Sequence, residues 1–267
     1  MEFIPTLNYQ EKHQELQRKR LENSAQWFLR LPEYKNWVNA TSSETTLWCP
    51  GHPGVGKTFL TLVPTSAIYC ILQLIRVFSS IIVDTLLYRV RLNKGRVAYF
   101  YFNYGEQIQQ KPERVLQCLL RQVLYTYQCL PESAAELHTC FQQGQSLPAW
   151  EKLVKIFGKL CAENTETYII LDALDECNPN DHRRSIIELL ATLRDLGVRT
   201  CVTSREFAED ISFAFSKSTK VKITASEDDM RRLLEIKIAS ARHMSRLIDK
   251  DLKEDIVQTI LGKSRGM

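Results

Sequence analysis

The sequence shows no large excess of charge of either sign and no targeting segment. Its 267 residues include 35 lysines and arginines against 31 aspartates and glutamates, for a formal net charge of +4. This near balance gives no reason to expect attraction to nucleic acid or to a membrane surface. The N-terminus also lacks a basic region followed by an apolar core, so it does not resemble a secretory signal. We therefore expect a cytoplasmic globular protein.

Patterns of metal-binding and disulfide-forming residues are missing as well. None of the eight cysteines forms a C-x-x-C pair, and the five histidines show no zinc-type spacing. We expect the cysteines to be mostly buried free thiols in a reducing compartment. No internal repeat is visible, which gives no support to a solenoid or propeller.

The most informative stretch that is present runs Gly51-His52-Pro53-Gly54-Val55-Gly56-Lys57-Thr58. It matches the phosphate-binding pattern G-x-x-x-x-G-K-[ST] at every required position, and it lies between a β-type run at 45–49 and residues that can open a helix. The glycines let the backbone approach a phosphate, and the loop N–H groups and the helix N-terminus would face the anion. Lys57 would reach the β- and γ-phosphates, and the Thr58 hydroxyl would bind Mg²⁺. The alternative is a glycine-rich turn before an ordinary helix.

Acidic residues follow a second apolar run, at 167–171. Asp172 stands at the carboxyl end of this predicted strand, where open α/β sheets bind ligands, and would hold Mg²⁺ directly or through water. Asp175 and Glu176 follow within one turn, and either would orient or deprotonate an attacking water; we favour Glu176. Alone this pattern is a weak signal, but downstream of a phosphate-binding loop it becomes strong.

A later predicted strand, at 199–204, leads into Arg205. At that position the guanidinium would sense or stabilise charge on a γ-phosphate. The structural alternative is that Arg205 only caps the strand end or pairs with a surface carboxylate.

Strand and helix patterns alternate from residue 45 to 224, which predicts an α/β fold with a mostly parallel five-stranded sheet between helices. The domains that we expect are a short helical lead at 1–40, a P-loop domain at 41–225 and a further helical segment at 226–267. Pro32 is expected to divide the lead into two short helices. The predicted strands are 45–49, 96–104, 167–171, 199–204 and 220–224, and the predicted helices of the P-loop domain include 112–124, 132–143, 149–162 and 181–196.

Together these residues resemble the NACHT-type P-loop NTPases, specifically fungal members with a nephrocystin-like N-terminal region. The resemblance covers about residues 20–267, and its specific marks are the runs 48–51, 97–102, 171–177 and 203–205. It implies the roles given above for Lys57, Thr58, Asp172 and Arg205. It also implies a switch of the signal-transduction (STAND) ATPase class, similar to those of innate immunity.

In such proteins nucleotide exchange or hydrolysis alters packing against a helical lid, and a repeat domain, often ankyrin or WD, senses the protein partner. The resemblance also suggests homo-oligomerisation on activation. By this resemblance the segment 226–267 is the beginning of the helical lid; the chain stops at Met267 inside it and contains no repeat array. We therefore interpret it as truncated before the sensor region, so that partner binding through missing C-terminal repeats is absent from this polypeptide.

A second departure from the family pattern is an interrupted helix after the phosphate-binding loop. Phe59-Leu60-Thr61 would join naturally to the run 80–87 as one amphipathic helix, but residues 62–79 intervene. They carry Pro64, which we expect to break the helix. We predict an insertion at 62–79, either a recent one or a translated intron. A membrane span is disfavoured, because one crossing would separate the phosphate-binding loop from Asp172.

The leading functional hypothesis is a nucleotide-dependent signalling switch that binds NTP with Mg²⁺ and hydrolyses it slowly. The alternatives are a nucleotide-binding scaffold without turnover and, less favoured, a small-molecule phosphotransferase, for which the sequence shows no arginine-rich lid. ATP is favoured over GTP because Asn93-Lys94 is followed by Gly95-Arg96, which does not complete the Asn-Lys-x-Asp box of guanine-specific GTPases.

Overall fold

The computed structural model describes most of the chain between residues 7 and 223. The described residues are 7–20, 24–51, 65–93, 95–143, 148–163, 166–180 and 182–223, with 228–229, 231–232, 235–236, 254–255 and 257–259 beyond them. Most of the predicted lid at 226–267 and residues 52–64 of the loop region therefore lie outside the described part, and the lid stays a prediction.

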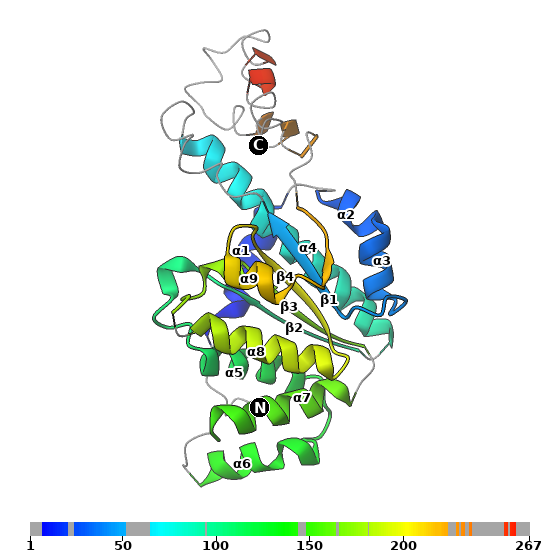
Figure 1. Cartoon of the computed structure of the whole chain (residues 1–267), viewed down its shortest axis with the longest axis vertical. Helices are drawn as coiled ribbons and strands as arrows, with labels where there is room; N and C mark the ends of the chain where they lie inside the picture. Colours follow the sequence, from blue (N-terminus) through cyan, green and yellow to red (C-terminus); the bar gives the residue numbers. More distant parts are fainter. Residues whose placement is uncertain are drawn as a thin grey trace.

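A five-stranded parallel sheet forms the centre of the molecule (Figure 1). Its strands lie in the order β2-β3-β4-β1-β5, and every described pair is parallel. β1, β3 and all but the ends of β2 and β4 are buried, as expected for apolar runs covered by helices on both faces. This confirms the predicted fold class. The strands are β1 (Thr46–Gly51), β2 (Arg96–Tyr101), β3 (Thr167–Asp172), β4 (Arg199–Arg205) and β5 (Thr219–Lys220).

The fifth strand is shorter than the predicted run 220–224. Only Thr219 and Lys220 pair as a strand with β1, and Ile223 then forms an isolated parallel bridge with Gly51. Gly51 is thus bordered on one side by β4 and on the other by this bridge, so the last residue of β1 is held firmly in the sheet.

Helices cover both faces of the sheet. α1 (Tyr9–Arg18) and α4 (Thr65–Asn93) pack together against β2, while α5 (Pro112–Leu124) and α8 (His182–Asp195) cover the opposite face (Figure 1). α7 (Trp150–Ala162) packs on α5 and α8 from outside. The remaining helices are α2 (Gln26–Arg30), α3 (Pro32–Val38), α6 (Ala135–Gln142) and α9 (Glu209–Ala214), with short 3₁₀ turns at Tyr104–Glu106, Glu132–Ala134 and Leu174–Glu176.

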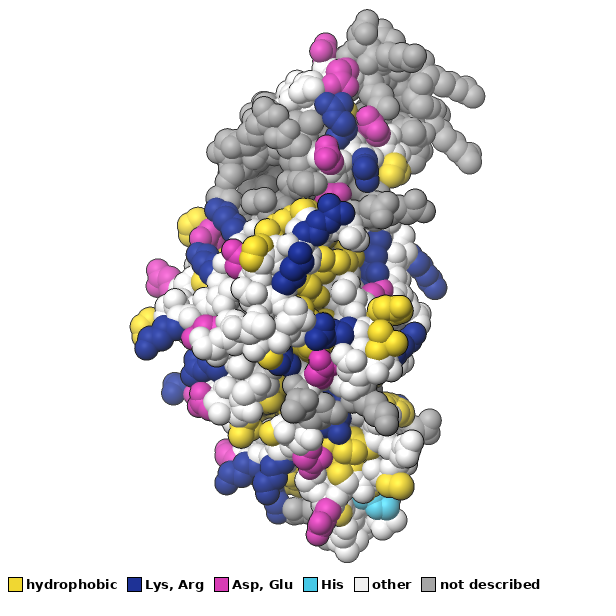
Figure 2. Space-filling model, turned by 90° about the vertical axis from the view of Figure 1, so that its right-hand side faces the viewer, with side chains coloured by type: hydrophobic (Ala, Val, Ile, Leu, Met, Phe, Trp, Pro, Cys, Tyr) yellow, Lys and Arg dark blue, Asp and Glu magenta, His cyan; other side chains and the backbone are white. Residues whose placement is uncertain are grey.

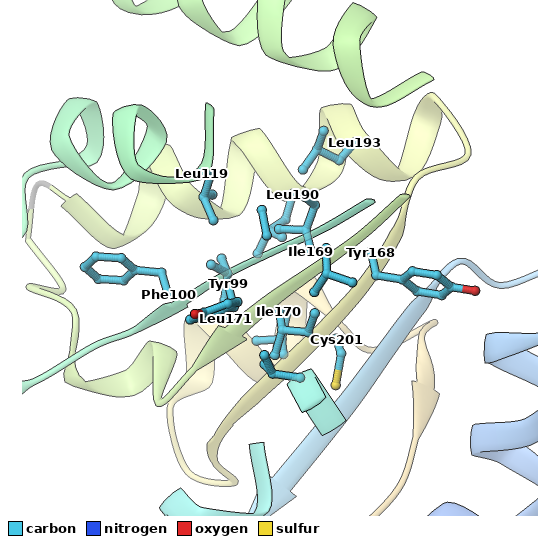
Figure 3. Close-up of a cluster of buried hydrophobic side chains, with 14 of the residues drawn as sticks. Tyr99, Phe100, Leu119, Tyr168, Ile169, Ile170, Leu171, Leu190, Leu193 and Cys201 are labelled. Atoms are coloured by element: carbon cyan, nitrogen blue, oxygen red, sulfur yellow. The ribbon is translucent and has the colours of Figure 1, made fainter. Parts of the chain in front are cut away.

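The core between the sheet and α5 and α8 consists of aliphatic side chains. Leu119 of α5 and Leu190 and Leu193 of α8 point toward the sheet, where Ile169 of β3 lies (Figure 3). All four side chains are at most 1% exposed. At about 1.5–3 kcal/mol for each fully buried aliphatic side chain, this packing fixes β3, and therefore the residue at its end, in place.

Prolines were expected to interrupt two helical stretches. Pro32 begins α3, and Leu31 separates that helix from α2, which confirms the predicted division of the lead. The expected break at Pro64 stays untested, because residues 52–64 lie outside the described part of the chain. The described helix α4 runs unbroken from Thr65 to Asn93, so residues 65–79 belong to the same helix as the run 80–87.

The described surface charges and cysteines are as the near balance of charge and the absence of C-x-x-C pairs led us to expect. Lysine and arginine side chains are mixed with aspartates and glutamates on the described part of the face in Figure 2. The described cysteines are all free thiols, five of them buried, although Cys129 is exposed. Among the described residues, no helix has the length and apolar character needed to span a membrane.

Candidate functional site

The carboxyl edge of the sheet brings together the ends of three predicted functional segments. β4 lies between β1 and β3, and Gly51 at the end of β1 is in register with Arg205 at the end of β4. Neighbouring strands lie about 4.8 Å apart, so β1 runs about 10 Å from β3, and Gly51 lies two residues further along the sheet than Asp172. The phosphate-binding sequence therefore starts two strands away from Asp172, on the same edge.

Of the predicted phosphate-binding residues, the structure describes Gly51 alone. Gly51 is the last residue of β1, and its carbonyl accepts a hydrogen bond from the Glu206 backbone N–H at 3.2 Å. The predicted roles of the other seven are not tested, because these residues lie outside the described part of the chain: His52, Pro53, Gly54, Val55, Gly56, Lys57 and Thr58.

Asp172 is a buried carboxylate, 2% exposed, at the carboxyl end of β3. Two hydroxyl groups donate to its Oδ1: Thr203 of β4 at 2.6 Å and Ser79 of α4. Thr203 Oγ1 also accepts from the Ala173 backbone N–H at 2.8 Å. The carboxylate is thus oriented by a strand and a helix, which is how a metal-binding carboxylate is held in position.

The backbone turns sharply directly after Asp172. Ala173 has φ 54° and ψ 49°, a left-handed conformation that is uncommon for a residue other than glycine. The hydrogen bond from its N–H to Thr203 stabilises this turn. Strain of this kind, of the order of 1 kcal/mol or more, often marks functional sites.

Asp175 and Arg205 contact each other. Arg205 Nε lies 3.0 Å from Asp175 Oδ2, and the Arg205 backbone N–H donates to Oδ1 at 3.0 Å. Burial raises the pKa of Asp175, while Arg205 counteracts this rise. The pairing of Arg205 with a carboxylate was one of the two alternatives that the sequence left open for this residue.

Glu176 lies on the same turn but points to a different partner. Its Oε2 accepts from the Tyr104 backbone N–H at 3.0 Å, and its carbonyl accepts from Gln107 Nε2 at 2.7 Å. These contacts connect the loop after β2 to the turn after β3. Glu176 is therefore near the edge, as predicted, but in this structure its carboxylate supports the neighbouring loop.

A polar chain leads from this edge to the N-terminal helix. Tyr101 of β2 is in register with Asp172, and its hydroxyl lies 2.7 Å from His13 Nδ1 of α1. His13 Nε2 lies 3.0 Å from Asp84 Oδ1 of α4, which also accepts from Gln17. Because an ionised carboxylate only accepts hydrogen bonds, His13 Nε2 donates to Asp84. Burial raises the pKa of Tyr101, and the nearby Asp172 adds to this effect.

Sequence reasoning missed Ser79 and Thr203 as partners of Asp172. Thr203 belongs to the run 203–205 that contributed to the family resemblance, but only its arginine received a role. The signal that could have identified Thr203 was its hydroxyl, two residues before the end of a buried strand. Ser79 was assigned to the predicted insertion, so no signal pointed to it.

The donor set at this edge fits Mg²⁺ bound together with phosphate. Within the described residues, no group of three or more His, Cys, Asp or Glu side chains is placed to hold a metal ion. Magnesium is usually bound by one or two carboxylates plus substrate phosphates and waters, and seldom by an all-protein cage. Asp172, with hydroxyl groups beside it, meets that requirement.

Comparison with known proteins identifies the family. Residues 23–67 and 76–205 match the family described as "Nephrocystin 3, N-terminal", which is well over half of the chain. The chain belongs to this nephrocystin 3 N-terminal family. The match spans β1 to β4, Asp172 and Arg205, and it leaves out residues 68–75. Combined with the parallel sheet and the phosphate-binding sequence after β1, membership indicates the fold of a P-loop NTPase.

Other comparisons add little about this nephrocystin 3 N-terminal chain. No curated protein matches it. Similar solved structures include a DNA replication initiation factor, with 10% identity, a TM-score of 0.41 and coverage of 92% of this chain and 58% of that one. Another is the Aeropyrum pernix Orc1 protein in complex with DNA, with 13% identity, a TM-score of 0.44 and coverage of 89% and 51%. The chain thus spans little more than half of either structure, and at this similarity neither bears on what it binds.

Proposed function

We propose that this chain binds a nucleoside triphosphate with Mg²⁺ at the carboxyl edge of the sheet and hydrolyses it slowly as a signalling switch. The observation that carries the proposal is the placement of Asp172, buried and oriented by two hydroxyl groups, at the edge where β1 leads into the phosphate-binding sequence. Lys57 and the loop amides would hold the phosphates. Thr58 and Asp172 would hold Mg²⁺, which when bound neutralises phosphate charge.

Residues around Asp172 support hydrolysis in different ways. Asp175 has a pKa raised by burial and so is the described carboxylate better suited to accept a proton, whereas Glu176 was favoured from the sequence alone. Arg205 would stabilise phosphate charge after leaving Asp175, and its side chain is 57% exposed and therefore able to move.

ATP is the proposed nucleotide. The nearest sequence to a guanine-recognition box starts at Asn93, which ends α4 three residues before β2 begins. Asn93 therefore lies at the amino edge of the sheet, opposite Asp172, and cannot contact a base bound at the carboxyl edge.

A nucleotide-binding scaffold without turnover is the second candidate. It is favoured by the observation that Asp175 pairs with Arg205 and that the Glu176 carboxylate accepts from Tyr104, so each candidate for hydrolysis already has a structural partner. Signalling through protein partners, repeat domains of longer fungal relatives and oligomerisation on activation follow only from the family resemblance and are part of the proposal.

The test is a titration of the purified chain with ATP, GTP and their diphosphates, with and without Mg²⁺, followed by phosphate-release measurements. We expect Mg²⁺-dependent binding of ATP that Lys57→Ala reduces at least tenfold, and slow phosphate release that is lost in the same variant. Lys111→Ala, an exposed lysine before α5, is the matched control. Binding without Lys57-dependent phosphate release favours the scaffold, and no binding contradicts both candidates.

A further inference from the structure

Ser79 of α4 contacts Asp172, the carboxylate proposed to bind magnesium. Its hydroxyl donates to Oδ1 of Asp172, and both residues are buried, with exposures of 0% and 2%. In a P-loop protein the hydroxyl that meets the metal comes from the first turn of the helix after the loop, here the position of Thr58. In this structure Ser79, far along α4, is in contact with that carboxylate.

The described packing of α4 begins at Val77. Val77 and Phe78 are 2% and 3% exposed, and Ser80 is fully buried and accepts from Arg20 Nε at 2.8 Å. Further along, Asp84 is bound by residues of α1. The second half of α4, from Val77 on, therefore fixes this helix on the sheet.

The first half of α4 extends away from the site. An α-helix rises about 1.5 Å per residue, so Thr65 stands about 21 Å before Ser79 along the axis. Figure 1 shows this part of α4 projecting beyond the end of the sheet. The start of the helix after the phosphate-binding sequence is thus separated from Asp172 by about 21 Å of helix.

The sequence on either side of this segment repeats one chemical pattern. Phe59-Leu60-Thr61 precedes it, and Val77-Phe78-Ser79 ends it; each is two apolar residues followed by a hydroxyl residue. Removing 62–79 would join Thr61 to Ser80, so that apolar residues replace Val77 and Phe78 and a threonine hydroxyl replaces Ser79. Lys57 and Thr58 would then begin the helix within about one turn of Asp172.

We propose that residues 62–79 are an insertion that weakens nucleotide binding by placing the described start of α4 far from Asp172, and that the chain without them is the form that binds Mg²⁺–ATP tightly, with Thr61 in the place of Ser79. The family match omits residues 68–75, which lie inside this segment. The proposal rests on the proposed nucleotide site and adds that 62–79 weakens it.

The direct test compares the full chain with a variant lacking 62–79. We expect Mg²⁺–ATP to bind the deletion variant at least tenfold more tightly than the full chain, and Lys57→Ala to abolish the gain. Equal or weaker binding by the deletion variant overturns this inference but leaves the proposed function intact. Absence of Lys57-dependent binding in both chains overturns the two together.

Thermal unfolding tests which hydroxyl bonds Asp172 in each chain. In the full chain, Ser79→Ala removes a buried hydrogen bond and should lower the Tm by about 2 °C or more, whereas Thr61→Ala should not. In the deletion variant, Thr61→Ala should lower the Tm by the same amount. A deletion variant without a cooperative unfolding transition, or one whose Tm is insensitive to Thr61→Ala, overturns the proposal, because Phe59, Leu60 and Thr61 must fill the vacated positions.

Discussion

Arg205 holds Asp175 through two separate contacts, one from its guanidinium Nε and one from its own backbone N–H, each at 3.0 Å. The two partners differ in exposure, since the Asp175 side chain is 11% exposed and that of Arg205 is 57% exposed. The pair ties the end of β4 to the turn after β3. Both residues are therefore positioned by each other before any ligand binds.

Arg205→Ala should make stability more sensitive to pH. Burial raises the pKa of Asp175 and Arg205 opposes that rise, so the variant should raise it further. A raised folded-state pKa gives stability that is present below the ordinary value near 4 and is lost as pH rises through the folded value. Urea unfolding should show a deficit of about 0.5–1 kcal/mol at pH 7 that disappears near pH 3. A deficit of the same size at both pH values would contradict the pairing.

Asp84→Asn should show the opposite pH dependence. Burial alone would raise the pKa of Asp84, but hydrogen bonds from His13, Gln17 and Arg20 outweigh it and hold that pKa well below its ordinary value. The stability from this carboxylate is therefore present above about pH 4 and is lost as pH falls through the folded value. We expect the variant to lose about 1–3 kcal/mol at pH 7, with the difference narrowing below pH 4. Asp195→Asn, at an exposed surface pair, should change little.

Thr203→Val tests whether the buried Thr203 hydroxyl helps Asp172 to bind Mg²⁺ as well as stabilising the fold. Thr203 donates to Asp172 and accepts from Ala173, so its loss should cost about 1–3 kcal/mol of unfolding free energy and raise the Mg²⁺ concentration needed for nucleotide binding. Thr200, also buried, bonds Thr46 at the other end of β4. Thr200→Val should lower stability without changing the Mg²⁺ concentration needed for nucleotide binding. Thr203→Ser keeps the hydroxyl and should therefore need only the wild-type Mg²⁺ concentration. Identical Mg²⁺ requirements for the two valine variants would refute this assignment.

Gly95→Ala should destabilise the connection between α4 and β2. A Cβ at Gly95 would lie 2.7 Å from the Glu166 carbonyl oxygen and 2.8 Å from Val90 Cγ1, closer than real Cβ contacts allow. We expect a loss of about 1–3 kcal/mol in urea unfolding. Gly105→Ala is the matched control, since its Cβ would meet nothing closer than Asn103 Oδ1 at 3.6 Å. Equal stabilities of the two variants would show that the backbone at Gly95 relaxes freely.

The strands β1 to β4 could be predicted because each contains a short apolar run bounded by polar or turn residues, whereas β5, Thr219–Lys220, contains none and was misplaced. Asp172 follows such a run directly, so its place at the carboxyl edge could be inferred before its neighbours were known. The partners of Asp172 could not. Thr203 reaches it because β4 lies beside β3, and the alternation of strands and helices does not determine this strand order.

The helix after the phosphate-binding sequence was harder to predict for a local reason. Pro64, which was taken as a helix breaker, lies outside the described residues, so that expectation stays untested. The described helix α4 runs from Thr65 to Asn93. Most residues of the run 65–79 are β-branched, aromatic or small polar residues, which are weak helix formers, so its composition did not predict a helix.

The family match starts at residue 23, so α1 precedes it, yet this helix is part of the packed molecule. His13 is 5% exposed between Tyr101 and Asp84, and Tyr9 packs edge-on against Tyr99. A recombinant fragment cut at residue 41, where the sequence suggested a domain boundary, would strip Tyr101 and Asp84 of these partners and uncover aromatic surface on β2. Biochemical work on the proposed nucleotide-binding region therefore needs expression plasmids that retain α1, or the material obtained will be prone to aggregation.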